Sequence, residues 1–365
     1  QSRASRYRNL DDRSKMADAG AAPAAVAAEP GLMGMNIEEE KFLKEVGMKV
    51  AVSSITHPLL TTKTLIQLGH EPFALSTGKT LIVTGRNAYF LPNAFSYAKQ
   101  LAETHPAGWS VLMTGFDSAA LALIAGRYTT RWATDYLDKH FPDMGGKPEN
   151  IDEDERKLTD SQSFRRALRG AIRDSSVRTV AVFAARPFTV VCIRQIAQLI
   201  GGEGKYLNAA QGLSVILGEE GLGGLFSGVI PQLCAELIMV WGCAFVSFGA
   251  ERALTRSGID QNEDKEKGEK DYKEAQRLIN LFTPHVVSPF SYPYSVVSTV
   301  MACVGSGLIV SFLPYNPTFN NWQDAFEYLR PHGLKRGARL FLREQTGAVS
   351  VGMDKQLYAS NKHFA

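Results

Sequence analysis

The stretch EEGLGGLFSGVIPQLCAELIMVWGCAFVSFGA, residues Glu219–Ala250, decides the fold. Its first part holds four glycines and ends at Pro231. Glycine permits tight turns and close approach of backbones, and proline is tolerated in the first turn of a helix. The pattern therefore predicts a short helix, a glycine corner, and a new helix that begins near Pro231.

The helix after this corner is apolar enough to cross a membrane. From Gly221 to Ala250 the only charged side chain is Glu236. A run of this length spans the hydrocarbon core of a bilayer. A charge at that depth costs roughly 2.5 kcal/mol or more, so an acid there predicts a function. The alternative is a buried helix of a soluble protein with Glu236 paired, but the rest of the chain repeats the membrane-like pattern.

Charge is concentrated in a few segments of the chain, and the net charge is only +3. Between Leu278 and Gln323 there is no Asp, Glu, Lys or Arg. No cluster of basic residues with interleaved aromatics suggests nucleic acid. The four cysteines lie in apolar segments without the spacing of a metal site, so no disulfide framework, metal or cofactor is predicted. No catalytic motif with supporting context occurs, so we do not expect an enzyme.

The chain contains three copies of one unit. Each copy has a long helix with a central proline, a surface helix, a glycine corner and a second long helix. The prolines Pro58, Pro187 and Pro293 are expected to kink the long helices. A repeat of this size predicts pseudo-symmetric packing. The predicted divisions are a disordered tail (1–40), the first unit (41–137), a charged linker (138–163), the second unit (164–254), another charged linker (255–274), an incomplete third unit (275–343) and a C-terminal tail (344–365).

These units resemble the mitochondrial carrier family. Its repeat carries P-x-[DE]-x-x-[KR] on the odd helices and an EG…G-aromatic corner before the even ones. Pro58 with Lys63 matches the first motif apart from its acid, and EEGLGGLFSGVIPQL matches the second. The segments HPLLTTKTLIQLGHEP, PNAFSYAKQLAE and RGARLFLR are similar to the mitochondrial carrier homologs, a divergent outer-membrane branch. The resemblance covers about 42–343 and implies an all-α membrane helical bundle with three pseudo-repeats.

The chain departs from the family at the motif that closes the pore. In solute carriers, the acids and bases of the motif form a ring of salt bridges. Here the three acid positions hold Leu60, Thr189 and Ser295, and the basic positions hold Lys63, Cys192 and Ser298. Alternating access needs two closable states. An inner-membrane solute carrier that exchanges small metabolites is therefore the less favoured alternative.

The second departure is a degenerate or missing sixth transmembrane helix. It should follow Gly337, yet the longest uncharged run there, Gln345–Met353, is too short to span a bilayer. Five spans would leave the bundle open on one side. A short or displaced sixth helix is the alternative, because helices inside a bundle tolerate polar residues.

Polar side chains of the spans are expected to line this opening, because charges within membrane spans usually face the bundle interior or water. Arg178, Arg186 and Arg194 lie eight apart and can share one helix face. The predicted groove residues are Lys63, Glu236, Arg186, Arg194, Arg127, Asp117 and Tyr294.

The resemblance implies an insertase of the mitochondrial outer membrane. Such a multi-pass protein would insert α-helical proteins, tail-anchored ones included, through a hydrophilic groove that faces lipid. Its partners would be transmembrane client proteins, membrane lipids and apoptosis-regulating proteins, and the same groove could scramble lipids. Besides the solute carrier, the remaining alternative is a receptor or scaffold without transport activity.

Overall fold

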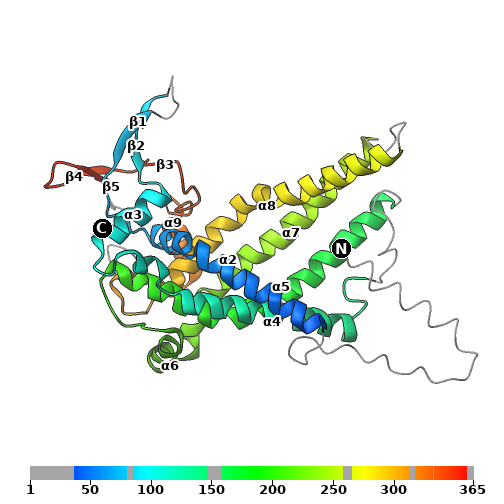
Figure 1. Ribbon diagram of the computed structural model, residues 1–365, viewed down its shortest axis with the longest axis horizontal. Helices are drawn as coiled ribbons and strands as arrows, with labels where there is room; N and C mark the ends of the chain where they lie inside the picture. The colour runs from blue at the N-terminus through cyan, green and yellow to red at the C-terminus, as the bar shows by residue number, and fades with distance from the viewer. Residues whose placement is uncertain are drawn as a thin grey trace, which may run out of the picture.

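Long helices dominate the computed structural model, which describes residues 37–79, 85–146, 158–257, 265–312, 317–331 and 333–359. They run side by side near the strands and diverge toward the other end of the molecule (Figure 1). The predicted tail before residue 37 and the linker residues 147–157 and 258–264 lie outside the described residues. The long helices are α2 (Ile37–Gln67), α4 (Phe116–His140), α5 (Asp160–Ala197), α7 (Val229–Arg256) and α8 (Lys265–Cys303).

Three of these segments are long and apolar enough to cross a membrane: Gly108–His140, Asp160–Ile200 and Val229–Arg256. Only 11% of the most apolar window of α7 is buried, against 61% in α5. The apolar side chains of α7 therefore face outward, as expected of a helix surrounded by lipid. Together these helices form the predicted helical membrane bundle.

Three shorter helices connect the long ones: α3 (Ala94–Thr104), α6 (Ala209–Leu225) and α9 (Trp322–Leu329). An asparagine precedes each of them. The side chain of Asn93 accepts a hydrogen bond from the Ser96 N–H at 2.8 Å, and that of Asn208 accepts one from the Gln211 N–H at 2.9 Å. These bonds satisfy N–H groups that have no partner within the helix. The short 3-10 helices are η2 (Gly108–Met113), η4 (Gln198–Ile200) and η6 (Ile309–Ser311).

The glycine corner lies between α6 and α7, as the sequence predicts. Gly228 adopts φ 67° immediately before α7, and Pro231 lies in the first turn of that helix. A Cβ at Gly228 would lie 2.6 Å from both an Arg186 nitrogen and the Ser298 carbonyl oxygen. Both the backbone conformation and the close packing therefore require glycine at this position.

The motif prolines lie inside continuous helices. Pro58 is within α2, Pro187 within α5, and Pro293 within α8, which also contains Pro284 and Pro289. The predicted charged linkers are shorter than expected, because α4 extends to His140 and α8 already begins at Lys265. Charged residues continue a helix readily where they are exposed to water.

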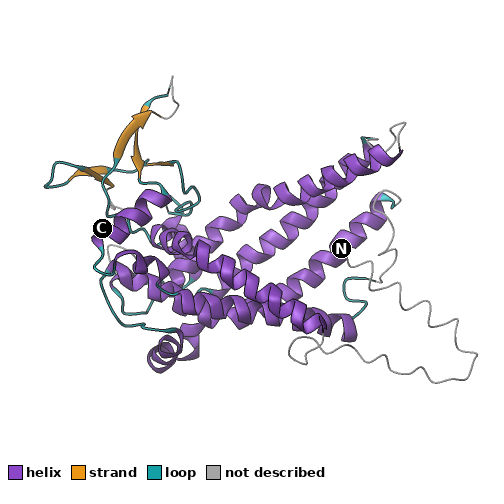
Figure 2. Cartoon of the chain, viewed as in Figure 1, coloured by secondary structure: helices purple, strands orange, loops and turns teal. Residues whose placement is uncertain are grey.

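The chain also contains short strands, which the sequence analysis did not predict (Figure 2). β1 (Ser76–Lys79) and β2 (Asn87–Leu91) form an antiparallel hairpin, and β3 (Arg343–Glu344) pairs with β2. β4 (Val349–Val351) and β5 (Leu357–Ala359) form a second hairpin. Within residues 333–359 the chain thus forms strands and turns, and no sixth long helix occurs there.

Candidate functional site

A cavity of about 490 Å³ lies between α4, α5 and α7. Its volume is in the range of ligand-binding sites. Small apolar residues such as Gly126, Ala181 and Ala185 leave the space open. Its polar lining consists of Arg127, Thr130, Asp174, Arg178, Gln232 and Glu236.

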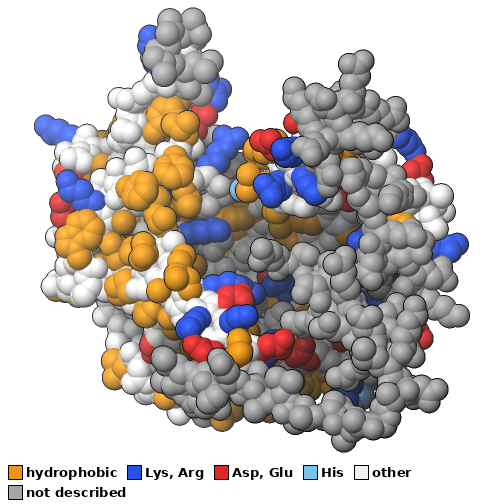
Figure 3. Space-filling model, turned by 45° about the vertical axis from the view of Figure 1, so that its right-hand side comes forward, with side chains coloured by type: hydrophobic (Ala, Val, Ile, Leu, Met, Phe, Trp, Pro, Cys, Tyr) orange, Lys and Arg blue, Asp and Glu red, His pale blue; other side chains and the backbone are white. Residues whose placement is uncertain are grey.

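Two ion pairs lie at this cavity; Arg178, Glu236 and Arg127 line it, whereas the partner of Arg127 lies outside the lining. Arg178 Nε of α5 lies 3.4 Å from Glu236 Oε2 of α7, and the two side chains are 54% and 33% exposed. Arg127 of α4 lies 3.4 Å from Glu45 Oε1 of α2. Each pair therefore keeps hydrogen-bonding capacity that protein atoms do not use. The space-filling view shows a hollow in which basic side chains lie beside hydrophobic ones (Figure 3).

Lys63 lies outside this cavity, where α2 meets α8. Its Nζ is 5.2 Å from the centre of the Tyr292 ring, which is the geometry of a cation–π contact. Next to it, Gln67 Nε2 donates to the Tyr292 hydroxyl at 3.1 Å, and Thr299 Oγ1 donates to Gln67 Oε1 at 3.2 Å. The Tyr292 hydroxyl in turn donates to the Arg336 carbonyl oxygen at 2.6 Å. Mostly uncharged polar groups thus hold α2 and α8 together.

Arg186, a predicted groove residue, is buried and does not line this cavity. It is 1% exposed and donates to the carbonyl oxygens of Ser227 at 2.9 Å and Ser298 at 3.2 Å. It also donates to Gln232 Oε1 at 2.5 Å. A buried guanidinium requires several acceptors, and the glycine corner supplies them. Arg186 therefore fixes the orientation of Gln232, which does line the cavity.

Arg194 is likewise a buried structural residue, at 0% exposure. Its guanidinium makes a two-pronged pair with Glu220, one prong being Nη2 to Oε2 at 2.9 Å. Its Nε donates to the Ala302 carbonyl oxygen at 2.8 Å. Arg194, a predicted groove residue, does not line this cavity, because its donors point into the core between α5, α6 and α8.

Asp117 and Tyr294 also lie away from the cavity. Asp117 Oδ2 accepts a hydrogen bond of 2.5 Å from the Ala209 N–H at the start of α6, where the helix dipole favours an anion. The Tyr294 ring packs on Phe326 and Trp322 of α9, with ring centres 5.3 and 6.2 Å apart. Of the predicted groove residues, the structure brings Glu236 and Arg127 to one cavity and places the others elsewhere.

Comparisons with known proteins agree with the predicted resemblance. No model of a protein family matches the chain. The chain is 29% identical over 291 residues to "Mitochondrial carrier homolog 2" of Mus musculus, covering 80% of this chain and 90% of the relative. It is 28% identical over the same length to the Homo sapiens protein of that name. It is 29% identical to "Mitochondrial carrier homolog 1" of Mus musculus over 319 residues, 85% of this chain and 78% of the relative.

The chain is a relative of the mitochondrial carrier homologs. These names and the three membrane-capable helices identify a mitochondrial membrane protein. At two of the motif positions that are charged in solute carriers, this chain has hydroxyl side chains that donate to backbone carbonyl oxygens, one within α5 and one just before α7. Thr189 Oγ1 donates to the Ala185 carbonyl oxygen at 3.1 Å, and Ser298 Oγ donates to the Gly228 carbonyl oxygen at 2.8 Å.

Sequence reasoning missed two of the polar residues that line the cavity and two ion pairs at it. Glu45, Asp174 and Gln232 were not predicted, and neither was the pairing of Arg178 with Glu236. One signal was available: Asp174 and Arg178 are one helical turn apart, so both belong to one face of α5. The partners on α2 and α7 could not be found this way, because spacing along one helix does not reveal which helix faces it.

Proposed function

We propose that this protein is a multi-pass insertase of the mitochondrial outer membrane that inserts α-helical proteins, including tail-anchored ones. The observation that carries the proposal is the charged cavity among three membrane-capable helices. Within residues 333–359, no helix follows α9 that could close the bundle beside α8. The charged lining is thus available to a segment that enters from the side.

The physical task of an insertase is to move polar groups past hydrocarbon. Each polar group without a hydrogen-bond partner costs several kcal/mol in lipid. Arg178 and Glu236 are each partly exposed, so they can bind the polar end of a client while they remain close to each other. Arg127 adds a second cation to the cavity from α4 and pairs with Glu45 outside the lining. The cavity therefore supplies both signs of charge along one path.

The same path suits lipid headgroups, which also carry both charges, so lipid scrambling is compatible with insertion. Apoptosis-regulating proteins remain proposed partners through the resemblance alone. A solute carrier would need a gate that opens at the α2–α8 contact. The lack of an acid–base pair at Leu60 and Lys63 counts against that alternative.

The test is insertion of a tail-anchored client into liposomes that contain the purified protein. Glu236→Leu and Arg178→Leu should each slow insertion, measured by protease protection of the client's last residues. The control is Arg330→Leu, which removes an exposed pair with Glu327 on α9, far from the cavity. Insertion at the wild-type rate by Glu236→Leu and Arg178→Leu would contradict the groove mechanism.

Two further outcomes would favour the alternatives. Saturable exchange of a specific metabolite by the same liposomes would indicate a solute carrier. If changes between residues 138 and 160 abolished activity while the cavity variants kept it, the protein would be a receptor or scaffold.

A further inference from the structure

A second cavity, of about 630 Å³, lies at the other end of the molecule, beside the strands. Four separate segments build it: the chain after α2, the end of α3 and the turn behind it, η4, and the β4–β5 hairpin. The walls are held in place by the Tyr97 hydroxyl, which donates to the His70 carbonyl oxygen at 2.9 Å, and by the Leu75 N–H, which donates to the Leu357 carbonyl oxygen at 2.7 Å. The Phe73 ring packs edge-on against Tyr97, 4.9 Å between centres.

No charged side chain lines this cavity among the residues that the structure describes. Burial lowers the pKa of His70 to about 4, so its imidazole is uncharged at neutral pH. Phosphates, carboxylates and ammonium groups would lose their water here without gaining an ionic partner, which is costly. The ligand that fits this cavity is therefore uncharged.

The cavity offers both hydrogen-bond donors and acceptors. Within the described part of the chain, the side-chain amides of Gln100 and Gln356 have no hydrogen-bond partner, and each carries two donors and one acceptor oxygen. His105 Nδ1 accepts from the Ala107 N–H at 3.2 Å, so the proton of the neutral ring is on Nε2, which is a donor. The Tyr358 hydroxyl donates to Asp354 Oδ2 at 2.6 Å and keeps its acceptor capacity. A ligand that forms hydrogen bonds with all four of these side chains needs both N–H and C=O groups, as an amide has.

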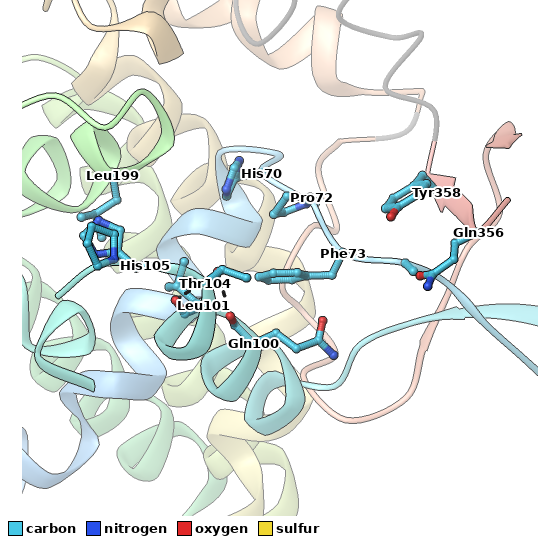
Figure 4. A pocket seen from close by; sticks show the side chains of 12 residues that line it. His70, Pro72, Phe73, Gln100, Leu101, Thr104, His105, Leu199, Gln356 and Tyr358 are labelled. Carbon is cyan, nitrogen blue, oxygen red and sulfur yellow. Dashed lines mark hydrogen bonds between the residues drawn. The ribbon is translucent and has the colours of Figure 1, made fainter. Parts of the chain in front are cut away.

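Polar side chains are spread along the length of the cavity (Figure 4). His105 lies beside Leu199 at one end, Gln356 and Tyr358 lie at the other, and His70, Phe73 and Gln100 lie between them. Gln356 and Pro106 are exposed at the rim, so a chain can enter at one end and leave at the other. We infer that this cavity binds a short, extended, uncharged polypeptide segment, with its amides on Gln100, His105 and Gln356 and an apolar side chain on Phe73. This function is independent of the proposed insertion.

The test is binding of the uncharged peptide acetyl-Leu-Phe-Gly-amide to the full-length protein in detergent micelles. A fluorine on the phenyl ring allows the titration to be followed by fluorine NMR. We expect saturable binding that weakens about tenfold in the double variant Gln100→Leu with Gln356→Leu, because two hydrogen bonds are lost. The matched control is Gln323→Leu, at an exposed position of α9 outside the cavity, which should bind like the wild type. Circular dichroism and Tm establish that both variants fold.

Three outcomes would overturn the inference. One is equal binding by the double variant and the wild type. Another is equal or tighter binding of the same peptide with free amino and carboxylate ends. The third is tighter binding of benzamide, a small aromatic amide, than of the peptide, because it would identify a small-molecule site.

Discussion

The two ends of the helical bundle use the same residue types in opposite ways. Near the strands, Arg186 and Arg194 are fully buried and surrounded by acceptors from neighbouring elements. Toward the other end, where α7 and α8 diverge from α2 and α4, Arg127 and Arg178 each have one carboxylate partner and stay partly exposed. One end is thus a fixed scaffold, and the other keeps charge available for a ligand.

The difference shows that the sequence of an apolar helix does not reveal whether a charged residue in it holds helices together or stays available to a ligand. A buried guanidinium whose donors are all used holds helices together, and removing it exposes several orphaned acceptors. A half-exposed one contributes little to stability and can exchange partners. The following predictions test this contrast, starting with the change that should have the largest effect.

Arg194→Leu should destabilise the protein most. It leaves the Glu220 carboxylate without its buried partner, which costs about 3–5 kcal/mol. Thermal unfolding of the purified protein in detergent measures the loss as a lower Tm. The double variant Arg194→Leu with Glu220→Leu should recover part of the stability, because no charge is then left unpaired. Arg330→Leu, on the exposed pair with Glu327, should change the free energy of unfolding by less than about 0.5 kcal/mol.

Tyr292→Phe should have an intermediate effect at the contact of α2 with α8. It removes the hydroxyl that binds both Gln67 and the Arg336 carbonyl oxygen, at a cost of about 1–3 kcal/mol. Spin labels on α2 and α8 should report a broader distance distribution near residue 67. An unchanged distribution together with an unchanged Tm would show that this hydroxyl does not hold the two helices together.

His70→Gln should make stability less dependent on pH under acidic conditions. The folded state lowers the pKa of His70 from 6.5 to about 4. Between these values the unfolded chain binds more protons, so wild-type stability falls as the pH drops through this window. The variant should lose less Tm between pH 6.5 and pH 4 than the wild type does. Identical pH profiles of Tm would contradict the burial of a neutral His70.

Glu236→Gln should have the smallest effect on stability. If water fills the cavity, the loss of its pair with Arg178 changes the free energy of unfolding by about 0–1 kcal/mol. Insertion of a client should nevertheless slow. A fall in Tm as large as that of Arg194→Leu would show that Glu236 is shielded from water. The charged residues at the two ends of the bundle would then play the same structural role.

The sequence predicts the helices well because each carries its own local signals. The corner at Gly228 and Pro231 is readable since few residues other than glycine adopt its positive φ. The helices α3, α6 and α9 start at asparagines that satisfy N–H groups locally. The strands had no such signal: β2 pairs Phe90 with Glu344, far along the chain, and strands of two to five residues are too short to show a clear alternation.

The site was predicted only in part, because the depth of a side chain depends on its neighbours. Arg178, Arg186 and Arg194 share a spacing of eight, yet only Arg178 reaches the cavity. Arg186 and Arg194 lie where the corner and α8 pack closely against α5. In the sequence, Asp117 looks like an acid within a membrane span. In the structure it lies in the first turn of α4 beside the start of α6, where it accepts a hydrogen bond from a backbone N–H.

The pairing of β3 with β2, far earlier in the chain, has a consequence for how the protein folds during its synthesis. Arg343 is buried against Glu71, 272 positions earlier in the chain, and its neighbour Glu344 lies 2.7 Å from Arg86. Contacts of such long range form slowly, after the intervening chain has been made. The hairpin β1–β2 therefore cannot gain its third strand before the chain has been made as far as Glu344. A chain shortened before residue 343 would lack the Arg343–Glu71 contact, which holds the segment after α2 against β3.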